Sequence, residues 1–121
     1  MIACVDSDVL IDYFDGIHAA ADELSLYDGL LVSRITWMEV LVGAPTTELR
    51  MVREDFLRRF SIVELDERVA REAIALRQQF RLKLPDAIIW ASARLNNALL
   101  VTRNVKDFPL PDPGIRAPYR V

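Results

Sequence analysis

Short apolar runs alternate with stretches of helical periodicity along the chain. Four runs predict strands, at residues 2–5, 30–33, 61–65 and 98–102, and a weaker fifth strand is predicted at residues 116–121. A stretch that fits a helix follows each of the first four runs. Residues 30–32 and 99–101 are apolar at consecutive positions, as in strands covered on both faces. The pattern therefore predicts an α/β fold in which helices sandwich a parallel sheet.

Three helices can be predicted from their first residues or from their apolar faces. Residues 48–60 carry apolar side chains at spacings of three and four, which predicts one apolar stripe on a helix. Asp66 precedes a helical stretch and is predicted to be its N-cap. Pro85 opens a run that has no charge after Asp86 for several residues, which predicts a largely buried helix.

The size and composition of the chain limit the classes of protein it can be. Its 121 residues and 52 % hydrophobic content fit a single domain, residues 1–121. We expect a cytoplasmic protein, because no apolar run is long enough for a membrane span or a signal peptide. The net charge of −3 argues against indiscriminate coating of nucleic acid. It does not exclude a nuclease, because bound divalent cations reverse the local charge of an acidic site.

Polar residues follow the predicted strands or the helices next to them. Asp6 directly follows the first strand, Glu39 lies six residues after the second, and Asp86 opens a later helix. Asn104 and Asp107 lie in the loop after the fourth strand. Ligands bind open α/β sheets outside the carboxyl ends of their strands. We therefore expect these side chains to gather there and to carry the chemistry.

The ligand types in this set favour a hard divalent cation. Mg²⁺ and Mn²⁺ take oxygen ligands and hold substrate phosphates through a few carboxylates and water. Asp6, Glu39 and Asp86 are the expected metal ligands, and such an ion could activate water and stabilise a leaving oxygen. No histidine is needed, and the only one, His18, falls in a predicted surface helix.

Each acid also has a purely structural interpretation. Asp6 could cap the helix that follows it, although Ser7 or Asp8 would be the more comfortable cap. Asp86 could merely complement the dipole of its helix. A further set of acids is assigned to a solvated helix face and turn, and the first of them is the one expected to matter because of its proximity to Asp6: Asp8, Asp12 and Asp15. Trp37 and Trp90 are predicted to lie in the core or an interface between subunits. The functional hypothesis rests on the combination.

Four motifs resemble the PIN-domain family, and in particular its VapC-type toxin ribonucleases. They are Val5-Asp6-Ser7-Asp8-Val9-Leu10-Ile11-Asp12-Tyr13, Ser33-Arg34-Ile35-Thr36-Trp37-Met38-Glu39-Val40, Leu84-Pro85-Asp86-Ala87-Ile88-Ile89 and Val101-Thr102-Arg103-Asn104-Val105-Lys106-Asp107-Phe108. The resemblance implies a three-layer α/β/α sandwich with a parallel sheet of four to five strands. It also implies Mg²⁺- or Mn²⁺-dependent cleavage of RNA, a homodimer, and inhibition by a cognate antitoxin that alone contacts DNA.

The family's first three acids fall on Asp6, Glu39 and Asp86. Many PIN domains have an aspartate where this chain has Asn104, and Asp107 is the residue that could compensate. The resemblance leaves a second metal ion undecided. Four further residues are expected to support the site or contact substrate: Ser7, Thr36, Thr102 and Arg103.

Three other interpretations share parts of this pattern. The first strand and its acids also resemble haloacid-dehalogenase-like phosphatases, which need a downstream lysine and a paired acidic motif that this chain lacks. A receiver domain would need a phosphoacceptor aspartate at the end of its third strand, where this chain has Glu64-Leu65-Asp66. A PIN scaffold that binds RNA or a partner with little catalysis stays open because of Asn104.

Overall fold

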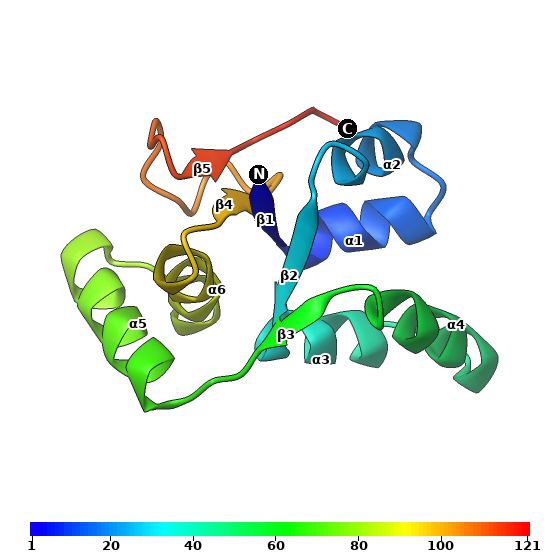
Figure 1. The fold of residues 1–121 in the computed structure, drawn as a ribbon, viewed down its shortest axis with the longest axis horizontal. Helices are drawn as coiled ribbons and strands as arrows, with labels where there is room; N and C mark the ends of the chain where they lie inside the picture. Colours follow the sequence, from blue (N-terminus) through cyan, green and yellow to red (C-terminus); the bar gives the residue numbers. More distant parts are fainter.

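The computed structural model describes residues 1–121 as one parallel sheet with six helices (Figure 1). The strands are β1 (Ile2–Val5), β2 (Gly29–Ser33), β3 (Ser61–Val63), β4 (Leu99–Val101) and β5 (Ile115–Arg116). The helices are α1 (Ser7–Phe14), α2 (His18–Leu24), α3 (Arg34–Val42), α4 (Thr47–Leu57), α5 (Glu67–Phe80) and α6 (Leu84–Leu95). The strand order is β3-β2-β1-β4-β5, and every neighbouring pair is parallel. The predicted α/β sandwich is confirmed.

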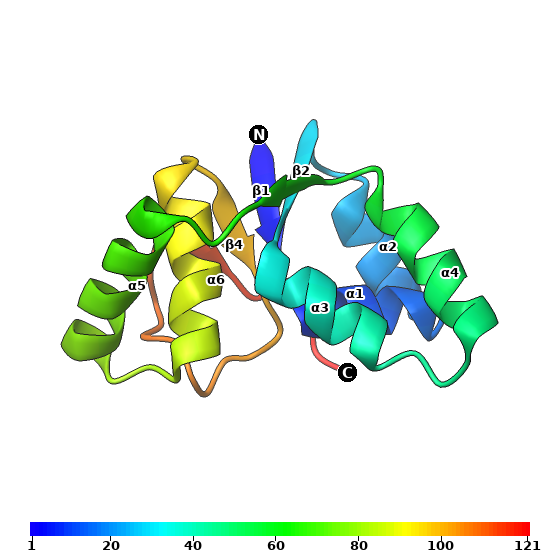
Figure 2. The ribbon, with the colours of Figure 1, turned by 90° about the horizontal axis from the view of Figure 1, so that it is seen from below.

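Two apolar cores lie on opposite faces of the sheet. One joins α5 and α6 to the sheet, and the other lies under α1 to α4 (Figures 1 and 2). β1 shows why its residues are apolar in succession: Cys4 belongs to the first core, while Ala3 and Val5 belong to the second. All three are completely buried. A strand that alternates between two cores has no solvated face, which is the arrangement expected of a parallel sheet.

Side-chain caps and proline start the helices where the sequence places them. The Asp66 carboxylate accepts a hydrogen bond from the Val69 backbone N–H at 2.9 Å, which confirms it as the N-cap of α5. Pro85 lies in the first turn of α6, and seven consecutive residues of that helix, 87–93, are buried. Trp90 is among them and packs against Phe80 and Phe108. It is therefore a core residue, as predicted.

The predicted C-terminal strand is present, but its predicted bounds of 116–121 are wrong. β5 covers only Ile115–Arg116, and the remaining residues run on without strand structure. Pro118 explains part of this result, because proline has no backbone N–H to donate to a sheet ladder. β1 has the predicted bounds, and β2, β3 and β4 differ from the predicted strands by one or two residues.

The strand order changes direction at the centre of the sheet. From β1 the chain builds outward through β2 and β3, then crosses to the other side of β1 to form β4 and β5 (Figure 1). The Asp6 N–H donates to the Val101 carbonyl oxygen at 2.9 Å, so the ends of β1 and β4 adjoin at this switch. Receiver domains have the order 2-1-3-4-5, so the topology argues against that alternative. None of the helices combines the length and the apolar character needed to cross a membrane.

Candidate functional site

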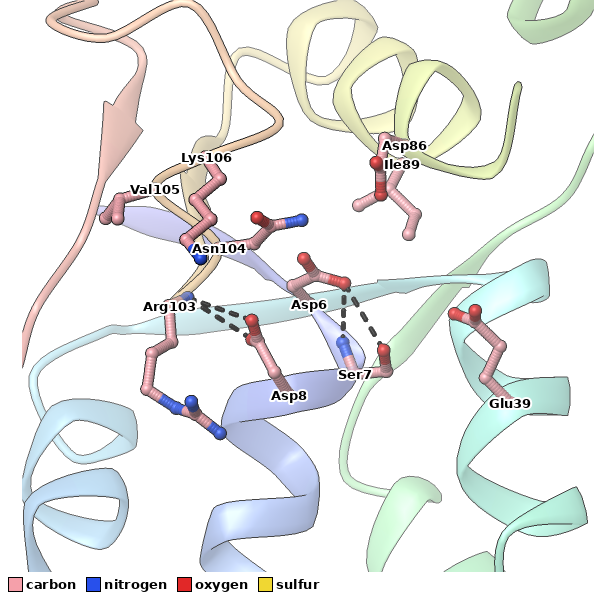
Figure 3. A pocket seen from close by; sticks show the side chains of 10 residues that line it. All are labelled: Asp6, Ser7, Asp8, Glu39, Asp86, Ile89, Arg103, Asn104, Val105 and Lys106. Carbon is pink, nitrogen blue, oxygen red and sulfur yellow. Dashed lines mark hydrogen bonds between the residues drawn. The ribbon is translucent and has the colours of Figure 1, made fainter. Parts of the chain in front are cut away.

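A cavity of about 410 Å³ opens beside the carboxyl ends of β1 and β4. Ten residues line it: Asp6, Ser7, Asp8, Glu39, Asp86, Ile89, Arg103, Asn104, Val105 and Lys106. Four of them are carboxylates, and Figure 3 shows those of Asp6, Glu39 and Asp86 around one space. Residues that are scattered along the chain therefore meet at the switch in strand order, where α/β sheets bind ligands.

The polar side chains of the cavity come from several elements. Asp6 directly follows β1 and is also the N-cap of α1, so the capping role and a place in the cavity coincide in one side chain. Glu39 lies on α3, Asp86 lies in the first turn of α6, and Asn104 lies in the loop after β4. The cavity thus depends on the relative placement of three helices and two strands.

Asp6 is the most buried carboxylate of the cavity and is held by two hydrogen bonds. It is 5 % exposed, and its carboxylate accepts hydrogen bonds from the Ser7 backbone N–H at 2.7 Å and from Thr102 Oγ1 at 2.8 Å. Burial raises the pKa of Asp6 to about 6; the two hydrogen bonds oppose the rise, and the charges of Asp86 and Glu39 add to it. Ionisation of Asp6 in the folded protein therefore costs free energy, and a nearby cation would lower that cost.

Asp8 belongs to the same site, and its assignment to a solvated helix face is wrong. Its two carboxylate oxygens accept from the Arg103 backbone N–H at 3.3 and 3.2 Å. Burial and the charge of Asp6 raise the pKa of Asp8 to about 6. The position of Asp8 two residues after a strand-end acid, in the first turn of the same helix, was the only signal in the sequence.

Glu39 and Asp86 complete an anionic, all-oxygen donor set. Burial raises the pKa of Glu39, with a further contribution from the charge of Asp86. Burial also raises the pKa of Asp86, followed by the charge of Asp107. No three of these carboxylates are already close enough to ligate one ion, so some side chains would turn inward to do so. The donor chemistry fits Mg²⁺ or Mn²⁺, and the repulsion between the acids favours a cation among them.

Asn104 and Asp107 form a closed pair. The Asn104 amide donates to Asp107 Oδ2 at 3.0 Å, and the Asp107 N–H donates to Asn104 Oδ1 at 3.3 Å. Asn104 lines the cavity, whereas Asp107 does not, and Lys83 Nζ lies 3.9 Å from the Asp107 carboxylate. Asp107 therefore affects the site through Asn104 and through its charge.

The side chain of Arg103 is committed to a buried acid. Arg103 Nε and Nη2 donate to the two carboxylate oxygens of Asp12 at 2.7 and 3.0 Å, and Tyr119 Oη donates to Asp12 Oδ2 at 2.8 Å. Asp12 is 5 % exposed, so its predicted place on a solvated face is wrong. The backbone of Arg103 holds Asp8, while its guanidinium is directed away from the other acids (Figure 3).

Thr36 and Lys106 differ from what the sequence predicted for them. Thr36 is fully buried, does not line the cavity, and its Oγ1 has no hydrogen-bond partner. It is therefore not in a position to contact substrate. Lys106, which the sequence reasoning passed over, lines the cavity and forms no ion pair. Ser7, through its backbone N–H, and Thr102, through its hydroxyl, each donate a hydrogen bond to the Asp6 carboxylate.

Comparisons with known proteins identify the family. A PIN domain model matches residues 3–109. Ribonuclease VapC10 of Mycobacterium tuberculosis is 35 % identical over 114 residues, which cover 88 % of this chain and 85 % of that protein. A toxin–antitoxin complex from Klebsiella pneumoniae contains a chain that is 41 % identical, with a TM-score of 0.92 and coverage of 98 % and 99 %. VapBC-1 from nontypeable Haemophilus influenzae gives 26 % identity, a TM-score of 0.71 and coverage of 89 % and 90 %. This chain belongs to the PIN-domain family and, within it, to the VapC-type proteins.

Proposed function

We propose that this protein is the toxin endoribonuclease of a VapBC-type toxin–antitoxin pair and that it hydrolyses phosphodiester bonds of RNA with the help of Mg²⁺ or Mn²⁺. The observation that carries the proposal is the cavity in which Asp6, Asp8, Glu39 and Asp86 meet at the switch in strand order. The similarity to a ribonuclease and to a toxin–antitoxin complex supports it. An RNA substrate agrees with a cytoplasmic location.

Asp6, Glu39 and Asp86 are the residues that would hold the ion, because they come from three elements and face one space. When bound, such an ion supplies charge to the phosphate oxygens and makes a coordinated water more acidic. Asp8 adds a fourth negative charge to the site, which the neutral Asn104 does not. We propose that Asp8 therefore takes over part of the role that an acid at position 104 has in other PIN domains.

Thr102, Lys106 and Arg103 support the acidic site or contact the substrate. Thr102 Oγ1 donates to Asp6 and accepts from the Asn104 N–H at 3.0 Å, so it joins the two sides of the cavity. Lys106 is the free cation on the wall, and it is the best placed to contact a phosphate that enters the cavity. Arg103 holds Asp8 instead of substrate, because its guanidinium already binds Asp12.

A partner surface of the right character is present between α3 and α4. A cleft of about 290 Å³ between α3 and α4 is lined mainly by apolar side chains, among them Trp37, Met38 and Val42. Met38 is 52 % exposed and Val42 85 % exposed. Exposed apolar surface of this kind marks interaction sites. We propose that the cognate antitoxin and the second subunit of a homodimer cover such surface.

Cleavage of RNA by the purified protein tests the proposal. We expect Mn²⁺-dependent cleavage of a mixture of cellular RNAs, loss of cleavage with EDTA, and loss in Asp86→Asn without loss of folding. Asp22→Asn, an exposed acid on α2, is the matched control and should cleave normally. RNA that stays intact in Mn²⁺, with wild-type protein that is folded, would favour the binding scaffold and overturn the proposed activity.

A further inference from the structure

A second cleft beside the acidic cavity has the opposite charge. It measures about 530 Å³ and is lined by Arg77, Gln78, Arg81, Leu82 and Lys83, at the end of α5 and the start of α6. No acid lines it, although the chain carries a net charge of −3. Six of the thirteen arginines form ion pairs elsewhere, but Arg77 and Arg81 form none. Lys83 pairs with Asp107 at 3.9 Å, so the uncompensated positive charge of the cleft comes from Arg77 and Arg81.

The backbone and one hydrogen bond fix the shape of this cleft. Arg81 has left-handed backbone angles, φ 58° and ψ 38°, and its N–H caps α5 by donating to the Arg77 carbonyl at 2.8 Å. Arg77 Nη1 donates to the carbonyl of the buried Leu82 at 2.8 Å. A cation near the last turn also stabilises a helix, which accounts for Arg77. It does not account for Arg81 and Lys83, which lie beyond the helix and are exposed.

A chain of contacts joins this cleft to the acidic cavity. Lys83 lines the cleft, and its Nζ lies 3.9 Å from Asp107, whose carboxylate accepts from the Asn104 amide at the cavity wall. Asp86, which lines the acidic cavity, follows Lys83 by only three residues. Figure 2 shows the loop between α5 and α6 beside the loop that follows β4. A ligand that leaves the cavity on this side therefore meets the basic cleft next.

We propose that the cleft of Arg77, Arg81 and Lys83 binds the phosphate backbone of single-stranded RNA on one side of the cleaved bond. The inference rests on the proposed ribonuclease function and adds the path of the substrate. Arginine matches phosphate with paired donors, and a basic groove that follows the backbone is the usual means of holding a single strand. The acidic cavity repels RNA in the absence of a cation, so attraction at a neighbouring site aids capture of the substrate.

The test compares Arg81→Gln/Lys83→Gln with Arg68→Gln. Arg68 is exposed on the same helix, lies nine residues before Arg77 and does not line the cleft. With an RNA of about 12 nucleotides, the double variant should raise Kd in EDTA and KM in Mn²⁺ by about five- to tenfold. Arg81→Gln alone should raise both with kcat unchanged, because Lys83 also contacts Asp107 beside the cavity whereas Arg81 does not. The slope of log Kd against log salt should fall by roughly 1.4, because each phosphate contact on a single strand contributes about 0.7. Arg81→Lys should keep most of the affinity.

The outcomes separate this inference from the proposed function. An equal loss in Arg68→Gln would mean general electrostatic attraction and would overturn the inference, as would unchanged Kd and KM in the double variant. A change in dimer mass or in binding of an acidic partner protein, with RNA affinity unchanged, would overturn it in favour of a protein interface. If the wild-type protein binds RNA through these residues but cleaves none, the inference holds and the proposed function fails.

Discussion

Replacement of Asp6 by asparagine should make the protein more stable at neutral pH while it abolishes RNA cleavage. The pKa of Asp6 rises from its ordinary value of 3.8 to about 6 in the folded chain. A raised carboxyl pKa means that ionisation of the group destabilises the native state. The contribution of Asp6 to the free energy of unfolding is therefore most favourable below pH 3.8 and is lost as the pH rises through 6. The difference corresponds to roughly 3 kcal/mol of unfolding free energy at neutral pH.

Asparagine removes the charge but keeps only part of the hydrogen bonding. Its amide oxygen can accept from the Ser7 N–H, as Asp6 does, whereas its amide nitrogen cannot accept from Thr102 Oγ1. That loss costs about 1–1.5 kcal/mol. We therefore expect Asp6→Asn to raise the unfolding free energy by about 1–2 kcal/mol near pH 7.5. Near pH 4, where native Asp6 is protonated, the variant should be less stable than the wild type by up to about 1 kcal/mol.

Urea titrations followed by tryptophan fluorescence measure this reversal, in EDTA and at one protein concentration for every sample. Asp22→Asn is the control, because its carboxylate is exposed and forms no hydrogen bond, so its effect should stay within about 0.5 kcal/mol at both pH values. A difference between Asp6→Asn and the wild type that has the same sign and size at both pH values would refute the electrostatic reasoning.

Three further predictions concern the support of the site and its cation. Thr102→Val removes the hydroxyl that donates to Asp6, so it should lower the unfolding free energy by about 1–2 kcal/mol. Because this hydrogen bond lowers the pKa of Asp6, its loss should move the acid limb of the pH–rate profile to higher pH. An unmoved acid limb would contradict this role. Asp12→Ala leaves Arg103 and Tyr119 without their acceptor and should lower the unfolding free energy by about 2–3 kcal/mol in urea titrations; a loss under about 0.5 kcal/mol would show that the pair is not structural. Saturation with Mn²⁺ at about 100 times its Kd should stabilise the wild type by roughly 2.7 kcal/mol in thermal unfolding, and the Asp6→Asn variant much less; equal stabilisation of the two would place the ion elsewhere.

The sequence predicted the sheet and the cavity well because both depend on local patterns. Consecutive apolar residues identified strands buried on both faces, and polar residues at strand ends identified the edge where the cavity opens. Asp6, Glu39 and Asp86 do line one cavity, since parallel strands and the helices that follow them converge at one edge. The resemblance to PIN domains drew on the same positions.

The errors concern residues whose partners are distant in the sequence. Asp12 falls on a helix position that periodicity assigns to solvent, but Arg103 and Tyr119 reach it from 91 and 107 residues away. The prediction for Asp8 fails for the same reason, because the backbone N–H of Arg103, in the loop after β4, donates a hydrogen bond to its carboxylate. Helical periodicity carries no information on what the C-terminal residues cover. A pattern within one element could not have predicted these contacts.

Diffraction at the manganese absorption edge, from crystals grown with Mn²⁺, tests the central claim most directly. We predict an anomalous peak in the cavity within about 2.0–2.6 Å of oxygen atoms from at least two of Asp6, Glu39 and Asp86. The same crystals of Asp86→Asn should show a weaker peak or none. A fully occupied manganese ion at another place on the protein, with this cavity empty of metal while the crystallised protein cleaves RNA in Mn²⁺, would contradict the account.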